Sequence, residues 1–271
     1  MQAADARPSD PMTTSETRTS AKISACVITL NEADRIEACL QSLAFCDDIV
    51  VVDSGSTDGT AELAAALGAR VLQRVFDGYR SQKDFAVRAA QHDWVLCVDA
   101  DERVTPALRA SIEAERARGF PVAGYRFARA TEYFGAFLRH GNAYPDRVLR
   151  LFDRRRGGFR GEREIHEHAS VDGNVATLAG DLEHRAYRSL SDQLARLERY
   201  ARLMAEYQHA AGRRAHLYNV VFNPFWRFLR GYVLRAGFLD GWRGLVYAYI
   251  EANYVRQKFI KLWLLGRGEN I

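Results

Sequence analysis

The amino-acid sequence predicts an α/β fold with a mostly parallel β-sheet, followed by a helical C-terminal region. Short apolar runs alternate with segments of helical periodicity in the first part of the chain, whereas the pattern from Ser189 onward is helical to the end. In addition, two of the apolar runs end in acidic residues, Asp53 and Asp99. Open α/β sheets bind their ligands at the carboxyl ends of strands, so these two positions are candidates for a binding site.

The predicted elements follow one another in a regular order. The apolar runs predict strands over residues 23–30, 49–52, 69–75 and 94–98. Between them we expect a helix capped by Asn31, a helix over 60–67 that ends at Gly68, and a helix over 81–91, with a further helix opened by Thr105 and Pro106. This alternation implies right-handed crossovers between parallel strands.

After Gly119 the sequence pattern changes, and it predicts short strands without helices between them, at 124–130, 147–152, 164–171 and 174–178. We therefore expect three parts: a polar tail over residues 1–21, an α/β domain over 22–185, and a helical region rich in basic and aromatic residues over 186–271.

The composition and net charge argue against several classes of protein. The 271 residues are 48% hydrophobic and 27% charged, which is typical of a folded globular protein, and a net charge of +4 argues against a polycation that binds nucleic acid. The four cysteines show no CxxC spacing, the N-terminus lacks a signal-peptide pattern, and no apolar run reaches the roughly 18 residues of a membrane span. These features predict a cytoplasmic protein with reduced cysteines.

The C-terminal region interleaves aromatic residues with arginines and lysines. Its aromatic residues are Tyr218, Phe222, Phe225, Trp226, Phe228, Tyr232, Phe238, Trp242, Tyr247, Tyr249, Tyr254, Phe259 and Trp263. Such residues favour a membrane–water boundary, with the basic side chains directed at anionic headgroups. Packing of the same helices on the α/β domain, or in a dimer interface, is the alternative.

The acidic residues at the strand ends suit nucleotide and metal chemistry. Asp99 and Asp101 directly follow the apolar run 94–98, and Mg²⁺ or Mn²⁺ prefers carboxylate oxygens while keeping several waters. A divalent cation there can neutralise a diphosphate leaving group. Asp53 can accept a hydrogen bond from N3–H of uracil, a donor that cytosine lacks.

Three segments carry a resemblance to a known family. These are Val27-Ile28-Thr29-Leu30-Asn31-Glu32, Val52-Asp53-Ser54-Gly55-Ser56-Thr57-Asp58-Gly59-Thr60 and Asp99-Ala100-Asp101-Glu102. In this order and spacing the chain resembles glycosyltransferase family 2, whose members are inverting, metal-dependent enzymes with the GT-A fold, a Rossmann-like nucleotide-diphospho-sugar transferase fold. It looks most like the lipopolysaccharide core glucosyltransferases, through 78–83, 94–96, 165–168 and 237–244.

The resemblance implies roles for individual residues. Asp101 would contact the metal, with Asp99 on the ribose or the metal. Asp53 would meet the base, with the backbone of Thr29, Leu30 and Asn31, and with Glu32, nearby. Lys83 would offer a positive charge to the diphosphate.

On the acceptor side, inversion requires a base that deprotonates the attacking hydroxyl. The resemblance points to Glu167 as this base with His166 in support, and to Arg147 or Arg150 as a ligand for a phosphate on the acceptor. The expected reaction moves glucose from UDP-glucose to an inner-core sugar of lipopolysaccharide, at the cytoplasmic face of the bacterial inner membrane.

Three alternatives stay open at this point. The acceptor can be another lipid-linked or cell-envelope glycan. A phosphohydrolase of the haloacid-dehalogenase type also places an Asp-x-Asp motif after an apolar strand, although on the first strand rather than the fourth. A non-catalytic membrane adaptor would have kept the fold and lost the chemistry.

Overall fold

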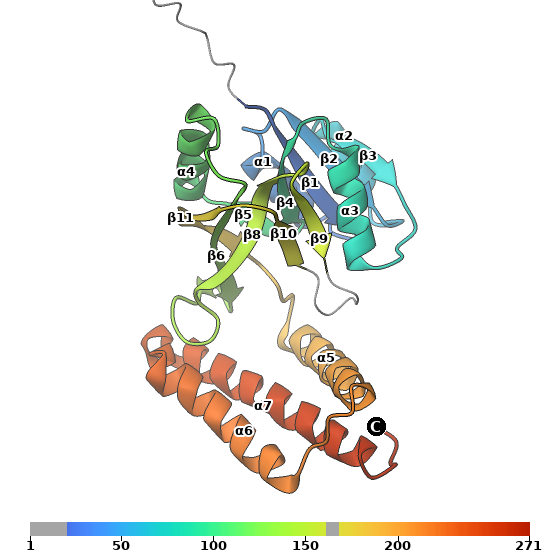
Figure 1. The fold of residues 1–271 in the computed structure, drawn as a ribbon, viewed down its shortest axis with the longest axis vertical. Helices are drawn as coiled ribbons and strands as arrows, with labels where there is room; N and C mark the ends of the chain where they lie inside the picture. Colours follow the sequence, from blue (N-terminus) through green and yellow to red (C-terminus); the bar gives the residue numbers. More distant parts are fainter. Residues whose placement is uncertain (1–20, 161–167) are drawn as a thin grey trace, which may run out of the picture.

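The computed structural model describes residues 21–160 and 168–271, so the expected tail over 1–21 lies almost wholly outside the described residues. Within them the chain forms a sheet domain and, below it in Figure 1, a helical region. The strands are β1 Ile23–Thr29, β2 Asp48–Asp53, β3 Arg70–Gln73, β4 Trp94–Asp99, β5 Glu102–Val104, β6 Gly124–Tyr133, β7 Ala136–Phe137, β8 Asp146–Asp153, β9 Gly157–Arg160, β10 His168–Val171 and β11 Val175–His184. The helices are α1 Ile36–Ser42, α2 Thr60–Ala66, α3 Tyr79–Ala89, α4 Pro106–Ala117, α5 Leu190–Ala210, α6 Leu217–Leu229, the π-helix η1 Arg230–Leu234, the 3₁₀-helix η2 Gly237–Asp240, and α7 Gly241–Leu265.

The main sheet has the order β3-β2-β1-β4-β8-β6-β11-β5, with β7 paired to β6. Strands β3, β2, β1 and β4 are all parallel, as the alternation of strands and helices predicts. The second half is mixed: β8 runs antiparallel to both β4 and β6, β11 is parallel to β6, and β5 is antiparallel to β11. Strands β9 and β10 form a separate hairpin.

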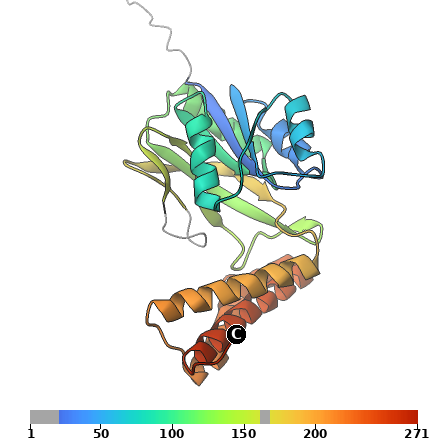
Figure 2. The same ribbon diagram turned by 90° about the vertical axis from the view of Figure 1, so that its right-hand side faces the viewer.

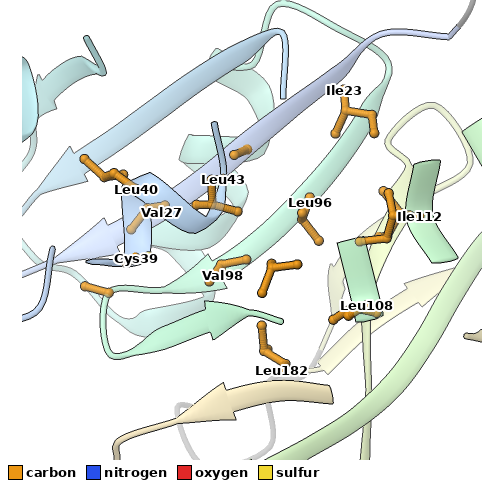
Figure 3. Close-up of a cluster of buried hydrophobic side chains, with 14 of the residues drawn as sticks. Ile23, Val27, Cys39, Leu40, Leu43, Leu96, Val98, Leu108, Ile112 and Leu182 are labelled. Carbon is orange, nitrogen blue, oxygen red and sulfur yellow. The ribbon is translucent and has the colours of Figure 1, made fainter. Parts of the chain in front are cut away.

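Both faces of the parallel strands are covered, which explains their nearly continuous apolar sequences. On one face, Ile23 and Val27 of β1 and Leu96 of β4 pack against α1 and α4, and Figure 3 shows these side chains converging with Leu40 and Ile112. On the other face, alternate residues of the same strands pack against α3. Three cysteines belong to this packing: Cys26, Cys39 and Cys97 are buried thiols.

The helix starts show where local sequence signals decided the structure. Thr105 caps α4 by accepting a hydrogen bond from the Leu108 N–H at 3.2 Å, with Pro106 in the first turn, as predicted. The prediction that Asn31 caps the first helix is wrong. Helix α1 begins only at Ile36, and Asn31 adopts a left-handed conformation with φ of 55° in the loop before it.

The helical region is a bundle of α5, α6 and α7 that lies as a separate layer beneath the sheet domain (Figure 2). Small residues of α5, Ala201 and Ala205, are fully buried, and Lys261 of α7 binds Glu198 of α5 at 3.0 Å. Arg227 of α6 forms an ion pair with Glu251 of α7. Within the described residues, none of these helices is long and apolar enough to cross a bilayer.

The two parts meet through backbone contacts at glycines. In the loop before β8, the Gly141 N–H donates to the Arg235 carbonyl at 2.9 Å, and a Cβ on Gly231 would collide with the Asn142 side chain. In the same contact, Asp240 accepts a hydrogen bond from the His140 N–H at 2.9 Å. Within the helical region, a Cβ on Gly244 would overlap the Gly237 carbonyl. The missing side chain of Gly231 thus lets the loop lie close to the helices, and that of Gly244 lets α7 pack directly on η2.

Candidate active site

The carboxyl ends of β1, β2 and β4 bring the predicted binding residues to one edge of the sheet. Thr29 is the register partner of Asp53, and Ile28 is the partner of Asp99. Residues from three separate sequence segments therefore lie side by side, as the position of ligand sites in open α/β sheets requires.

Asp53 is fully buried and organises the turn that follows it. Its Oδ2 accepts hydrogen bonds from the N–H groups of Gly55 at 3.0 Å and Ser56 at 2.9 Å, and its Oδ1 accepts one from the Ser56 hydroxyl. An ionised carboxylate has about four acceptor positions, so one is left unused by these bonds. The role of Asp53 towards a base stays a prediction.

The loop after β1 is tied to that same turn. The Asn31 N–H donates to Ser56 Oγ at 2.9 Å, Asn31 Oδ1 accepts from the Thr57 N–H at 2.9 Å, and the Glu32 N–H donates to Thr60 Oγ1. Leu30 is half exposed, whereas Thr29 Oγ1 is buried without a hydrogen-bond partner. The predicted set Thr29 to Glu32 is thus held beside Asp53.

Asp99 lies between two cations. Lys83 Nζ of α3 is 3.0 Å from Oδ1, and Arg150 Nη2 of β8 is 2.8 Å from Oδ2. Burial acts to raise the pKa of Asp99, but the charges of Arg150 and Lys83 outweigh it and hold that pKa well below its usual range. Burial acts to lower the pKa of Arg150, and its carboxylate neighbours Asp99 and Glu102 raise it further in the opposite direction. Asp99 is therefore ionised and already neutralised.

Asp101 has a different environment. Its Oδ2 lies 3.5 Å from His184 Nε2 and 3.9 Å from Arg35 Nη1, and its carbonyl accepts the Arg185 N–H at 2.9 Å. His184 Nδ1 is buried without a hydrogen-bond partner. Neither His184 nor Arg35 lies as close to Asp101 as Lys83 and Arg150 lie to Asp99, so Asp101 is the carboxylate better placed for a ligand.

Sequence reasoning missed His184. It is the last residue of β11 and the register partner of Glu102, which places it directly beside the Asp99–Asp101 turn. The sequence prediction ended this strand at residue 178, six residues too early. The available signal was a single histidine at the end of an alternating segment, next to the start of the helical region.

The predicted acceptor residues are separated by the structure. Arg147 is exposed on β8, whereas Arg150, three residues later, is buried against Asp99 and Glu102. Glu167 and His166 lie outside the described residues. The residues on either side of that gap, Arg160 and His168, are partners in the β9–β10 hairpin, and this hairpin is attached to α3 by the hydrogen bond from the Phe159 N–H to Asp84 Oδ1 at 3.1 Å.

A cleft of about 440 Å³ opens next to Asp101, between the sheet domain and α5. It is lined by Asp34, Arg35, Arg103, Glu132, Tyr133, Phe134, Arg185, Tyr187, Arg188, Ser189 and Gln193. Figure 1 shows the chain running from β11 into α5 along this side of the sheet. The volume falls in the range typical of small-molecule sites.

Among the described residues, no three His, Cys, Asp or Glu side chains cluster closely enough to hold a metal ion by themselves. Acidic and basic groups at the ends of parallel strands, next to a cleft of this size, are an arrangement that suits a phosphorylated donor and a second substrate. Together with the order of the sheet, they indicate a glycosyltransferase with the GT-A fold.

Comparison with known proteins identifies the family. The family model "Glycosyl transferase family 2" matches residues 24–130. The chain is 33% identical to the lipopolysaccharide core biosynthesis glycosyltransferase LpsC of Rhizobium meliloti (strain 1021), over 87% of this chain and 92% of the relative. It is 29% identical to an uncharacterized glycosyltransferase of Rickettsia bellii (strain RML369-C), over 85% and 82%. The protein therefore belongs to glycosyltransferase family 2, and the phosphohydrolase alternative is set aside.

A solved structure supports the fold. The mannosyltransferase PcManGT from Pyrobaculum calidifontis, solved in complex with GDP-Man and Mn²⁺, covers 90% of this chain and 88% of its own with a TM-score of 0.52 at 17% identity. At that identity the likeness speaks for the fold alone. The predicted GT-A fold with a helical C-terminal region is thus confirmed.

Proposed function

We propose that the protein is an inverting hexosyltransferase that moves glucose from UDP-glucose to an inner-core sugar of lipopolysaccharide. The acceptor class is supported by the near full-length relation to LpsC. The observation that carries the chemistry is the pair Asp101 and His184, which lie 3.5 Å apart at the strand ends beside the cleft.

The residues around Asp101 fit a divalent cation. A carboxylate oxygen suits Mn²⁺ or Mg²⁺, whereas an imidazole nitrogen suits a transition-metal ion such as Mn²⁺ better than Mg²⁺, and such ions complete their coordination with substrate phosphates and water. We propose Asp101 and His184 as the protein ligands of the cation. Asp99 is less available to it, because Lys83 and Arg150 already pair with its two oxygens. When bound, the cation would supply charge neutralisation for the departing diphosphate.

The remaining residues orient the substrates and move the proton. The loop from Thr29 to Glu32 and the free acceptor position of Asp53 would hold the uridine, because N3–H of uracil can donate to that carboxylate. Lys83 would place its ammonium group near the diphosphate. Glu167, supported by His166, would take the proton from the acceptor hydroxyl as that oxygen attacks the anomeric carbon from the face opposite the diphosphate.

We also propose that the protein binds the cytoplasmic face of the inner membrane without spanning it. Helix α6 carries an exposed apolar stripe at helical spacing, and more such residues follow it. We define the apolar surface as Leu217, Tyr218, Val221, Phe222, Phe225, Trp226, Val233, Leu234, Phe238, Leu239 and Trp242, all of which are about half exposed or more. The basic residues Arg213, Arg214, Arg230 and Arg235 are exposed along the same elements and suit anionic headgroups.

The donor proposal is tested by thermal unfolding with UDP, GDP, CMP and ADP, each with and without Mn²⁺. A ligand at about a hundred times its dissociation constant adds roughly 2.7 kcal/mol to the free energy of unfolding. We expect Mn²⁺-dependent stabilisation by UDP alone, lost in Asp101→Ala, weakened in His184→Ala and kept in the surface control Glu113→Ala. Stabilisation by another nucleotide would replace the donor, and no response to any nucleotide would favour the non-catalytic adaptor.

The membrane proposal is tested by sedimentation with vesicles of phosphatidylethanolamine and phosphatidylglycerol. Because α5 packs on α7, deleting the C-terminal helices would expose buried surface, so point variants are preferable. The double variant Phe222→Ser, Trp226→Ser should release the protein from the vesicles, whereas Leu67→Ser in the sheet domain should not. Unchanged sedimentation of the double variant, together with a change from dimer to monomer, would assign the surface to self-association instead.

A further inference from the structure

The cleft beside Asp101 carries more positive charge than transfer to a neutral sugar requires. We propose that it binds the acceptor through a negatively charged group, a phosphate or a carboxylate on the sugar, and that Arg103 and Arg185 recognise this group. The inference rests on the proposed function and specifies the class of acceptor.

The charges that line the cleft are unequal. Four arginines and two carboxylates face it, and they differ in how far their hydrogen-bonding capacity is used. Arg188 is fully engaged, because its Nη2 donates to the Asn31 carbonyl at 3.1 Å and to Glu32 and Asp34 at 2.9 Å each. Arg188 therefore fastens the loop after β1 rather than a ligand.

Arg103 and Arg185 both have unused donors. Arg103 lies on β5, and its side chain forms no hydrogen bond or ion pair with any residue in the described ranges. Arg185 Nε lies 3.0 Å from Glu132 Oε2, but the two groups are misaligned, so each of these buried atoms is left without a hydrogen bond. The buried donor of Arg185 is costly to leave without a partner, whereas Arg103 is half-buried, and an anion that enters the cleft could accept from both.

A third arginine supports the same conclusion. Arg35 is only 8% exposed, and its guanidinium lies 3.7 to 3.9 Å from Glu32, Asp34 and Asp101, which is too far for a hydrogen bond. Its Nη1 is buried without a partner. Arg35 therefore places an unsatisfied hydrogen-bond donor between the cleft and Asp101.

The rest of the lining suits a sugar. Tyr133, Phe134 and Tyr187 present aromatic rings to the cleft, and the Tyr133 hydroxyl is fixed by its hydrogen bond to Gln193 Oε1 of α5 at 2.9 Å. Aromatic walls with a few fixed polar groups are typical of small-molecule sites, and they match the apolar faces and hydroxyl edge of a hexose.

The two ends of the cleft lie next to the proposed metal site and next to the apolar surface. Arg35 and Arg185 connect it to Asp101, where the transferred sugar would leave its diphosphate. At the other end, Phe134 packs on Trp242 of the apolar surface, with ring centroids 5.7 Å apart. An acceptor whose charged sugar occupies the cleft would thus have its lipid part next to the surface proposed to meet the membrane.

The same chemistry has a second source, because the diphosphate of the donor is also an anion. The two sources are separated by measuring the affinities for UDP with Mn²⁺ and for simple sugars in the same variants. We would use ligand-observed NMR with mannose 6-phosphate, glucuronic acid and the neutral methyl mannoside as probes, at millimolar concentrations.

The wild-type protein should bind at least one charged probe about tenfold more tightly than methyl mannoside, as a charge-assisted hydrogen bond allows. Arg103→Gln and Arg185→Gln should each remove this preference and leave UDP affinity unchanged, whereas Arg103→Lys should keep part of it. The exposed Arg109→Gln on α4 serves as the control.

Equal binding of charged and neutral probes by the wild type, or full affinity in both glutamine variants, would overturn the inference. A parallel loss of UDP affinity in those variants would assign the arginines to the donor instead, which also overturns it. Failure of the wild type to bind UDP would contradict the proposed donor. The preference for charged over neutral sugars would still show whether the cleft binds an anionic acceptor.

Discussion

The sheet domain and the helical region treat their apolar side chains in opposite ways. Leu96, in the middle of β4, is 0% exposed, whereas Phe222, in the middle of α6, is 64% exposed. Charged side chains in the sheet domain are likewise drawn inside and paired, as in the group of Arg150, Asp99 and Glu102. The difference indicates separate roles for the two regions. The sheet domain holds the site in place through buried contacts, and the helical region exposes an apolar surface of the kind that binds another molecule or a membrane.

The largest effect is expected from a substitution that breaks the ion pairs around Asp99. Arg150→Met should lower the free energy of unfolding by about 4 kcal/mol, because it removes a partner from the buried Glu102 and the partly buried Asp99. Urea denaturation measures this change. Arg147→Met on the same strand is the matched control, and its exposed position should keep the effect within about 0.5 kcal/mol. Equal effects in the two variants would mean that the buried network does not stabilise the domain.

A second pair of variants compares the apolar side chains directly. Leu96→Ala should cost about 3 kcal/mol of unfolding free energy, because it leaves a cavity between β4 and the helices above it. Phe222→Ala removes a larger side chain, but from solvent, and should change the stability by less than about 0.5 kcal/mol. If Phe222→Ala proved as costly as Leu96→Ala, α6 would be packed against a partner in solution.

The smallest effect is a dependence on pH. The pKa of Asp99 is depressed in the folded state, so its stabilising contribution is complete above the unfolded pKa of about 4 and is lost as the pH falls below it. The stability difference between the wild type and Asp99→Asn should therefore be constant from pH 5 to pH 8 and should shrink below about pH 4. A change of this difference between pH 6 and pH 7 would instead point to a titrating histidine.

Local sequence signals predicted the parallel half of the sheet well. The strands that end at Asp53 and Asp99 are short apolar runs bounded by turn residues, and Thr105 with Pro106 marks the start of α4. These signals depend on neighbouring residues alone, so they are visible in the sequence.

What the sequence could not predict depends on contacts across the fold. Arg150 meets Asp99 only because β8 pairs antiparallel with β4, and His184 meets Asp101 only because β11 extends to pair with β5. Asn31 was predicted as a helix cap from its type, but the Asp53 turn engages its side chain first. Each of these contacts joins segments that are distant in the sequence.

The contacts between the loop before β8 and the helical region determine how far the catalytic edge of the sheet lies from the helical layer. Because the N–H groups of His140 and Gly141 in this loop donate to Asp240 and to the Arg235 carbonyl of the helical region, these contacts restrict tilting of the helical layer under the sheet domain. On a membrane, the catalytic edge would then stand at a constant elevation above the lipid headgroups. We expect such an enzyme to select its acceptor partly by reach, so that a glycan that is one sugar too short or too long presents its hydroxyl at the wrong level.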